Sequence, residues 1–376
     1  MNARQMTAMA EATRLTRQGR LVEATALIQQ TLAGPAAIRR PPEAAQLGLV
    51  RPGRLPRRRA VPRRDPSVLH RLLRPASPVV ELPPGRFDAF SYTNAAGARS
   101  YRLYIPASGA GQVLPLVVML HGGTQDAVTF AAATGMNDLA EREKFLVAYP
   151  EQPRSANAGR YWNWFALGHQ RRDAGEPSLI AGITAQVTSR YGADAARVYV
   201  AGFSAGGAMA AVMAAVYPDL YAAAGVHSGL AYAAATDLPS ALQAMRQGPP
   251  HPARLPAPSR AVPLIVFHGD QDAIVAPANA AGLIGHVLAA ASPDPHPGAL
   301  PTTVTSGQVS GGHAYTRTCY QHPAGAALAE CWIIHRGGHA WSGGVPHGSY
   351  TDARGPDASA EFIRFFGEHP AILPAR

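Results

Sequence analysis

The pattern of hydrophobic and polar positions divides the chain into three parts. Apolar residues recur at spacings of three and four over residues 3–32, interrupted by Gly19, which predicts a short helical hairpin at residues 1–33. Over residues 34–84 proline and arginine dominate, and such a composition neither holds a helix nor buries a core. We therefore expect a Pro/Arg-rich linker there, followed by one globular domain over residues 85–370.

The globular part alternates between strand-like and helix-like segments. Two strands around an Asn-Ala-Ala-Gly turn are expected within residues 87–106, and the continuous apolar run PLVVML is typical of a buried strand. Further expected strands are FLVAYP, RVYVAGFS, AAAGVHSG, VPLIVFHGD and ECWIIH, and the expected helices cover about 177–191, 205–216, 277–290 and 357–368. This alternation predicts an α/β fold in which helices flank a mainly parallel sheet and reactive groups gather at the carboxyl ends of its strands.

The charges are distributed unevenly along the chain. Residues 1–88 contain 16 arginines and 6 acidic residues, whereas residues 89–376 contain 18 basic and 18 acidic ones, so the formal net charge of +10 belongs to the N-terminal extension. A basic surplus is typical of proteins that bind polyanions, but the globular part is neutral. We therefore expect no nucleic-acid partner for its chemistry.

Hydropathy and cysteine content bear on the compartment. No stretch approaches the roughly 18–20 continuous apolar residues of a membrane-spanning helix, and the N-terminus lacks the apolar core of a signal peptide. We expect a cytoplasmic protein that does not span a membrane. Cys319 and Cys331 each flank a β-like run, so they either face each other across a hairpin or are two separate thiols.

The segment Gly202-Phe203-Ser204-Ala205-Gly206 matches G-x-S-x-G, the turn that presents a serine nucleophile in α/β-hydrolases. Its context fits, because a strand-like run enters it and an alanine-rich helical run leaves it. The turn is so tight that the flanking positions must lack side chains, and it directs the helix N-terminus at the serine oxygen. Ser204 is therefore the predicted nucleophile.

A serine hydroxyl needs a base, and the base needs a third group to hold it. In α/β-hydrolases the acid and then the histidine follow the serine along the chain. Asp272 follows the strand VPLIVFHGD and is the preferred acid, with Asp270 as the alternative. His339 follows two glycines after the strand ECWIIH and is the predicted base, ahead of His335 and His347.

The oxyanion of a tetrahedral intermediate needs preorganised backbone N–H donors. One is expected from Ala205, the residue after the nucleophile. The other is expected from the loop after LVVML, where Gly123 is the preferred donor and Thr124 the reserve. We interpret His121 as a structural hydrogen-bonding residue rather than a catalytic one.

Other side chains complete the expected site. Trp341, Trp164 and Trp162 are candidates for an apolar platform that binds acyl chains or an aromatic acid, with Trp341 preferred because it follows the base by two residues. The histidines near the C-terminus form neither an HExxH nor a CxxC pattern. We therefore expect no metal and no cofactor.

Longer strings are more specific than the pentapeptide at the nucleophile. LHGGTQ, YWNWF, GEPSLIAGIT, VYVAGFSAGGAMA, HGDQDAIV, GGHAWSGG and GSYTDARGPDASAEFIRFF together resemble the poly(3-hydroxybutyrate) depolymerase family of esterases over residues 88–369. The resemblance implies an α/β-hydrolase fold with a serine triad that acts on hydroxyalkanoate polyesters or their oligomers. It also implies Ser204, Asp272 and His339 as the triad and residues 121–124 as the oxyanion loop.

Two other functions stay open on the sequence alone. Relatives in the resembled family act on feruloyl or acetyl esters of plant polysaccharides, so a feruloyl or acetyl-xylan type esterase is the enzymatic alternative. A non-catalytic protein that binds polyester granules is the alternative of another class. Because the positive charge is concentrated at residues 1–84, that segment is the expected contact with a polyester granule surface.

Overall fold

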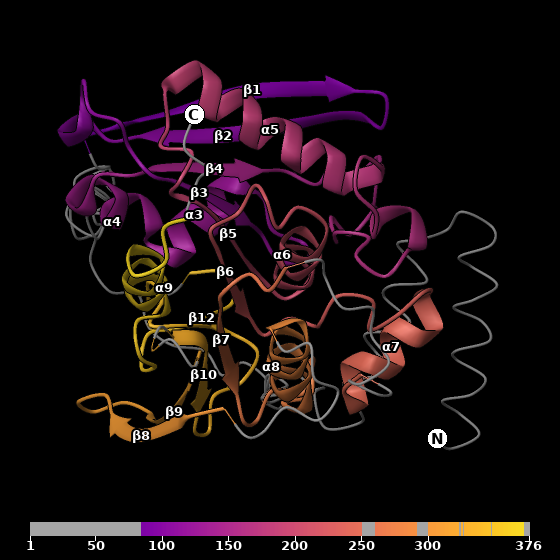
Figure 1. The fold of residues 1–376 in the computed structure, drawn as a ribbon, viewed down its shortest axis with the longest axis vertical. Helices are drawn as coiled ribbons and strands as arrows, with labels where there is room; N and C mark the ends of the chain where they lie inside the picture. Colours follow the sequence, from indigo (N-terminus) through magenta and orange to yellow (C-terminus); the bar gives the residue numbers. More distant parts are fainter. Residues whose placement is uncertain are drawn as a thin grey trace, which may run out of the picture.

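The computed structural model describes residues 84–249, 260–291, 300–322, 325, 327–346 and 348–371. The expected helical hairpin at residues 1–33 and all but the last residue of the expected linker lie outside these ranges. The described residues form one large sheet with helices on both sides and a small two-stranded sheet (Figure 1). None of the helices described is long and apolar enough to cross a bilayer.

The central sheet has ten strands in the order β1-β2-β4-β3-β5-β6-β7-β10-β9-β8. They are β1 (Arg86–Asn94), β2 (Gly97–Ile105), β3 (Leu116–Leu120), β4 (Leu146–Pro150), β5 (Val198–Phe203), β6 (Ala223–His227), β7 (Leu264–Gly269), β8 (Thr302–Gln308), β9 (Ala314–Gln321) and β10 (Ala327–Ile334). The strands from β4 to β10 in that order pair in parallel. Antiparallel strands extend the sheet at both edges. The expected mainly parallel α/β sheet is confirmed.

Helices cover both faces of this sheet. They are α3 (Ala127–Thr134), α4 (Met136–Glu143), α5 (Gly175–Tyr191), α6 (Ala205–Val216), α7 (Leu238–Gln247), α8 (Ala278–Ala291) and α9 (Ala358–Gly367). Figure 1 shows α5, α6 and α8 on one side of the sheet and α3, α4 and α9 on the other. The four helices expected from the sequence begin and end within two residues of the observed bounds.

The alternation of side chains along β3 divides the core into two halves. Leu116, Val118 and Leu120 belong to the half of the core that contains residues of α5, α6 and α8, whereas Val117 and Met119 belong to the half that contains residues of α3, α4 and α9. Successive side chains of a strand point to opposite faces of its sheet. A strand covered on both sides must therefore be apolar throughout, and all five residues of β3 are buried.

The two cysteines are separate free thiols. In the pairing of β9 with β10, Cys319 lies opposite Glu330, and Cys331 lies opposite Thr318. Paired residues share a face of the sheet and adjacent residues do not, so the two thiols point to opposite faces. Burial raises the pKa of the Cys331 thiol to about 12, so it behaves as a small apolar side chain.

Candidate active site

The carboxyl ends of the parallel strands lie side by side. The register pairs Leu120 with Gly202, Phe203 with His227, His227 with Phe267, and Gly269 with Ile334. The loops that follow β3, β5, β6, β7 and β10 therefore leave the sheet along one edge. These loops carry every residue that the sequence predicts for the triad and the oxyanion donors.

Ser204 occupies a strained turn between β5 and α6. Its backbone angles are φ 54° and ψ −119°, a conformation that a non-glycine residue adopts only when its surroundings enforce it. A Cβ atom on Gly202 would overlap the carbonyl of Gly206, and one on Gly206 would overlap the carbonyl of Leu120. The two glycines of the motif thus allow α6 to pack directly against the ends of β3 and β5.

Asp272 and His339 are in direct contact. The distance between His339 Nδ1 and Asp272 Oδ2 is 2.7 Å, and the Asp272 side chain is fully buried. The second carboxylate oxygen, Oδ1, accepts the backbone N–H groups of Ile274 and Val275 at 2.9 and 2.8 Å. Burial alone would raise the pKa of Asp272, but the hydrogen bond from His339 and the nearby donors outweigh it and lower the pKa. Asp272 is therefore an ionised acceptor that holds the imidazole.

The imidazole of His339 lies beside the turn that carries Ser204. Its ring centroid is 4.9 Å from that of Phe203, the residue before the serine. The hydrogen bonds found among the described residues include none between His339 and Ser204. Hydrogen bonds between a nucleophile and its base are often long until substrate binds. The structure thus joins the predicted base to the predicted acid and places the base beside the residue that precedes the predicted nucleophile.

Asp270, the alternative acid, has a different histidine as its partner. Its carboxylate lies 3.1 Å from His335 Nδ1 and accepts the backbone N–H of Arg336 at 2.6 Å, and both side chains are partly exposed. This pair closes the turn at the end of β10. The structure therefore places Asp272, and not Asp270, against His339.

The predicted oxyanion donors differ in their hydrogen bonds. The N–H of Thr124 donates to the carbonyl oxygen of Gly159 at 2.8 Å, so the expectation that Thr124 is a reserve donor is wrong. The amides of Gly123 and Ala205 have no acceptor among the described residues. A Cβ atom on Gly123 would overlap the ring of Tyr161, which explains why glycine stands there. Gly123 and Ala205 are the amides that remain able to bind an oxyanion.

The three tryptophans do not form the expected platform. Trp162, Trp164 and Trp341 have relative exposures of 0%, 5% and 1%. The indole of Trp341 packs edge-on against Phe130 and donates from Nε1 to Ser359 Oγ at 3.1 Å. Side chains buried to this degree belong to the core, where a substrate does not reach them.

Tyr350 is an exposed aromatic residue that the sequence analysis did not single out. Its side chain is 49% exposed, and its ring centroid lies 6.3 Å from that of Phe203, which in turn contacts His339. Its backbone has φ 55°, and its carbonyl oxygen accepts the N–H of Trp341 at 2.7 Å. The sequence places Tyr350 within GSYTD, in a glycine-rich loop after the predicted base. Its exposure distinguishes it from the buried tryptophans, and exposure is not visible in the sequence.

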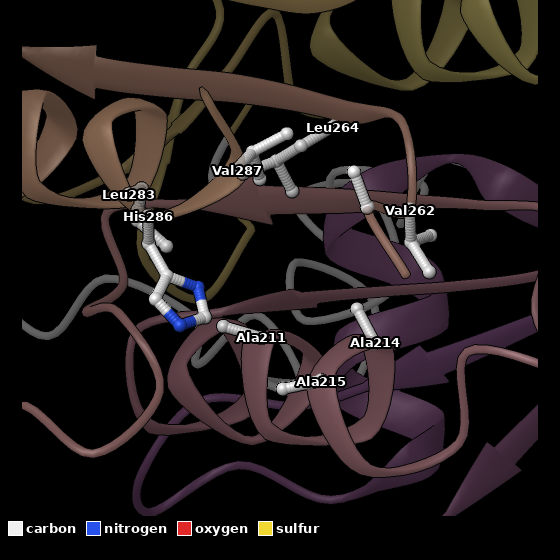
Figure 2. A pocket seen from close by; sticks show the side chains of 9 residues that line it. Ala211, Ala214, Ala215, Val262, Leu264, Leu283, His286 and Val287 are labelled. Atoms are coloured by element: carbon white, nitrogen blue, oxygen red, sulfur yellow. The ribbon is translucent and has the colours of Figure 1, made fainter. Parts of the chain in front are cut away.

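An apolar hollow lies away from this edge of the sheet. Figure 2 shows it between α6 and α8, lined mainly by alanine, valine and leucine side chains, with His286 at its border. None of its lining residues belongs to the predicted site. Within the described ranges, no group of three or more histidine, cysteine, aspartate or glutamate residues is arranged to hold a metal ion.

Comparisons with known proteins give a family and a fold. Residues 99–293 match the family model described as Esterase PHB depolymerase. Poly(3-hydroxyalkanoate) depolymerase C of Paucimonas lemoignei is 36% identical over 201 residues, which cover 50% of this chain and 47% of the relative. Acetylxylan esterase A of Talaromyces purpureogenus is 36% identical over 137 residues, which cover 36% of this chain and 35% of the relative.

A further relative and one solved structure extend this picture. Feruloyl esterase B of Neurospora crassa is 36% identical over 144 residues, which cover 38% of this chain and 47% of the relative. The chain thus spans less than half the length of each of these relatives. The structure of an acetyl xylan esterase from Aspergillus awamori superposes with a TM-score of 0.54 at 22% identity, covering 75% of this chain and 99% of that one. The two chains share the α/β-hydrolase fold expected from the sequence.

Proposed function

This chain belongs to the PHB depolymerase family of esterases, and we propose that it is a serine carboxylic ester hydrolase that acts through an acyl-enzyme. The observation that carries the proposal is the 2.7 Å contact of Asp272 with His339 beside the strained turn of Ser204. Ser204 attacks the ester carbonyl, and His339 takes the hydroxyl proton and passes it to the leaving alcohol. Water, deprotonated by His339, then attacks the acyl-enzyme and releases the acid.

The other residues of the site support this chemistry. Asp272 accepts from Nδ1 of His339, so the unprotonated Nε2 is free to act as the base. The N–H groups of Gly123 and Ala205 would stabilise the negative oxygen of the tetrahedral intermediate. Ala205 is the first residue of α6, so the positive end of the helix dipole adds to this stabilisation.

We propose 3-hydroxyalkanoate esters, as poly(3-hydroxybutyrate) or its oligomers, as the substrates. Support comes from the family and from the relative named as a poly(3-hydroxyalkanoate) depolymerase. The second candidate is a feruloyl or acetyl-xylan ester, favoured by the relatives that carry those names. Parallel measurement of turnover on a hydroxybutyrate trimer, methyl ferulate and acetylated xylan distinguishes these substrates.

The test of the reaction itself is the loss of the nucleophile. Wild-type protein should release p-nitrophenol from a short-chain p-nitrophenyl ester with a pre-steady-state burst, and Ser204→Ala should abolish turnover. Turnover retained by Ser204→Ala would refute the serine mechanism. Absence of turnover and burst in the wild-type protein would instead favour the non-catalytic alternative, a protein that binds polyester granules.

The basic extension suggests a partner for the esterase. We propose that residues 1–84 contact the surface of a polyester granule, and that the protein is cytoplasmic and associated with such granules. The support is the concentration of the positive charge in this part of the chain. A variant without residues 1–84 should lose co-sedimentation with granules while keeping its activity on soluble esters, and unchanged co-sedimentation would contradict the proposal.

A further inference from the structure

Glu176 is a buried carboxylate with no place in the proposed reaction. It lies in the first turn of α5, and its relative exposure is 0%. Removing a carboxylate from water is costly unless charged partners and N–H donors replace the lost water. The position of those donors therefore indicates what the carboxylate holds in place.

The donors to Glu176 come mainly from the segment between β4 and α5. Oε1 accepts from Gln152 Nε2 at 2.5 Å and from Asn163 Nδ2 at 2.7 Å, and Oε2 accepts from the backbone N–H of Asn163 at 2.8 Å. Arg99 supplies the positive charge at a longer distance of 3.4 Å. The shortest contacts of Glu176 thus fix Gln152 and Asn163, the two residues that bracket this segment.

The segment fixed in this way wraps around the oxyanion loop. The ring of Tyr161 fills the space beside Gly123 where a side chain would otherwise stand. The indole of Trp162 donates to the carbonyl oxygen of His121 at 3.1 Å. Gln152 Nε2 also donates to the carbonyl oxygen of Tyr161 at 3.0 Å. Every one of these contacts joins the segment held by Glu176 to the loop of residues 121–123 or to the residues that cover it.

Gln152 also sets the protonation of His121. The backbone N–H of Gln152 donates to His121 Nε2 at 3.0 Å, so the single proton of the neutral ring is on Nδ1. Nδ1 lies 2.8 Å from the carbonyl oxygen of Gly122 and donates to it. Burial lowers the pKa of His121 to about 4, which keeps the ring neutral at pH 7.

The orientation of Gly122 determines that of the Gly123 amide. The described residues contain no cis peptide bond, so the carbonyl of Gly122 and the N–H of Gly123 point in opposite directions. Holding the carbonyl of Gly122 toward the ring of His121 therefore directs the N–H of Gly123 away from it. The same loop packs against the nucleophile turn, because a Cβ atom on Gly122 would meet the ring of Phe203 at 2.7 Å.

We propose that Glu176 is a positioning residue that fixes the Gly123 amide as an oxyanion donor, acting through Gln152 and Asn163. The inference rests on the proposed esterase function, because only a reaction with a tetrahedral oxyanion uses that donor. It assigns to a carboxylate in α5 an effect on the transition state rather than on substrate binding.

The test compares two fully buried carboxylates in the full-length protein. Glu176→Gln places an amide N–H where the oxygens accept three short N–H contacts, so the segment around Asn163 must shift. Glu330→Gln is the matched control, because Glu330 is also 0% exposed and is ion-paired with Arg317 and Arg364, on a strand that contributes nothing to the oxyanion loop. Asn163→Ala is the second test variant, since it removes one donor to Glu176 and leaves the charge in place.

Active sites are counted by titration with diethyl p-nitrophenyl phosphate, and kcat and KM are measured on p-nitrophenyl butyrate. We expect kcat per titrated site to fall about 10- to 100-fold in Glu176→Gln, part of the loss seen when an oxyanion donor is removed, with KM changed less than about threefold. The inhibition constant of an aliphatic trifluoromethyl ketone, whose adduct carries an oxyanion, should rise by the same factor as kcat falls. Asn163→Ala should move both quantities in the same direction by a smaller factor.

Glu330→Gln is expected to lower thermal stability while leaving kcat per site and the inhibition constant at wild-type values. Wild-type kcat and wild-type ketone inhibition in folded Glu176→Gln and Asn163→Ala would overturn the inference. Should Glu176→Gln fail to fold, the same two quantities in Asn163→Ala decide. An inactive wild-type protein would overturn the proposed esterase function. An active wild-type protein with equally active variants would overturn only the inference about Glu176.

Discussion

The backbone N–H of Ser204 donates to the carbonyl oxygen of His227 at 2.9 Å, and the ring of His227 contacts the loop that follows His339. His227 Nε2 accepts the backbone N–H of Ser342, three residues after His339, also at 2.9 Å. The ring stacks on Trp341 with a centroid distance of 5.1 Å. A single buried residue at the end of β6 thus connects the turn of Ser204, the proposed nucleophile, with the loop that carries His339, the proposed base.

Replacing each of the two candidate acids in turn should show which carboxylate supports catalysis. In Asp272→Asn the amide oxygen can keep the N–H groups of Ile274 and Val275, so the amide nitrogen faces His339 and forces the wrong tautomer on the ring. We expect kcat to fall by about four orders of magnitude with little loss of stability. Asp270→Asn should keep kcat within about threefold, because its partner is His335. Steady-state kinetics on one ester decide, and equal losses in the two variants would contradict the assignment.

Buried neutral histidines should make the fold sensitive to mild acid. Burial lowers the pKa of His121, His227 and His268 from the ordinary value of 6.5. Because the unfolded chain then binds more protons than the native one, the free energy of unfolding decreases as pH falls below about 6.5. Each ring that stays neutral in the native state adds up to about 1.4 kcal/mol per pH unit to this slope below pH 6.5.

Urea unfolding at pH 7.5, 6 and 5 measures this dependence. The lowered pKa of Asp272 and of Glu330 acts in a different window, since their stabilisation is lost only as pH falls below the ordinary carboxyl range. His121→Asn should reduce the slope between pH 6.5 and 5 by about one proton. A free energy of unfolding that stays constant from pH 7.5 to 5 would contradict the buried neutral state of these rings.

The glycine at the start of α6 should tolerate no side chain. In Gly206→Ala the new methyl group would overlap the carbonyls of Leu120 and His121, so α6 must move away from β3. We expect a loss of stability of about 1–3 kcal/mol and a fall in kcat, because the displaced residues include the proposed nucleophile and the proposed oxyanion loop. Gly168→Ala is the control, since its Cβ atom would meet open space. Thermal unfolding and kcat are measured for both variants. Equal stability and equal kcat in Gly206→Ala and Gly168→Ala would refute the interpretation.

Tyr350 should affect substrate binding, whereas Trp341 should affect stability. We expect Tyr350→Ala to raise KM for esters of bulky or aromatic acids by about 3- to 10-fold while changing stability by less than about 0.5 kcal/mol. Tyr350→Phe should retain the wild-type KM, because the ring remains. Trp341→Ala should cost about 3–5 kcal/mol of stability, since it removes a buried indole. A Tyr350→Ala variant with unchanged KM on every ester tested would exclude this residue from substrate binding.

The sequence predicted the elements whose pattern is strong. The helix α6 was predicted to the residue, because a glycine turn begins it and an alanine-rich run continues it. The helices α3 and α4 were not predicted, since each has eight residues and Gly135, in the left-handed conformation, separates them. None of the residues of the strand β8 is buried, so it carries no hydrophobic alternation from which a strand is predicted.

Prediction of the site was limited by contacts between residues far apart in the chain. Trp341 lies two residues after His339 in the sequence, which suggested a substrate contact. In the structure, β11 (Trp341–Ser342) pairs with β12 (Thr351–Asp352), and the indole of Trp341 is buried in the core. The N–H of Thr124, a predicted oxyanion donor, instead donates to the carbonyl oxygen of Gly159, 35 positions later in the chain. The local sequence around Trp341 and around Thr124 shows neither the pairing with β12 nor the hydrogen bond to Gly159. The prediction of the triad used long-range information of another kind, because in α/β-hydrolases the serine, the acid and the histidine follow one another in that order along the chain.

The proposed base and the exposed aromatic ring occur on one stretch of chain, from His339 to Tyr350. Exchanging that whole stretch with a homologous esterase to change the preferred ester would also move the proposed general base and break the contact of Ser342 with His227. Engineers who want a new selectivity would do better to vary position 350 alone, one residue at a time, and leave the backbone on either side of it untouched.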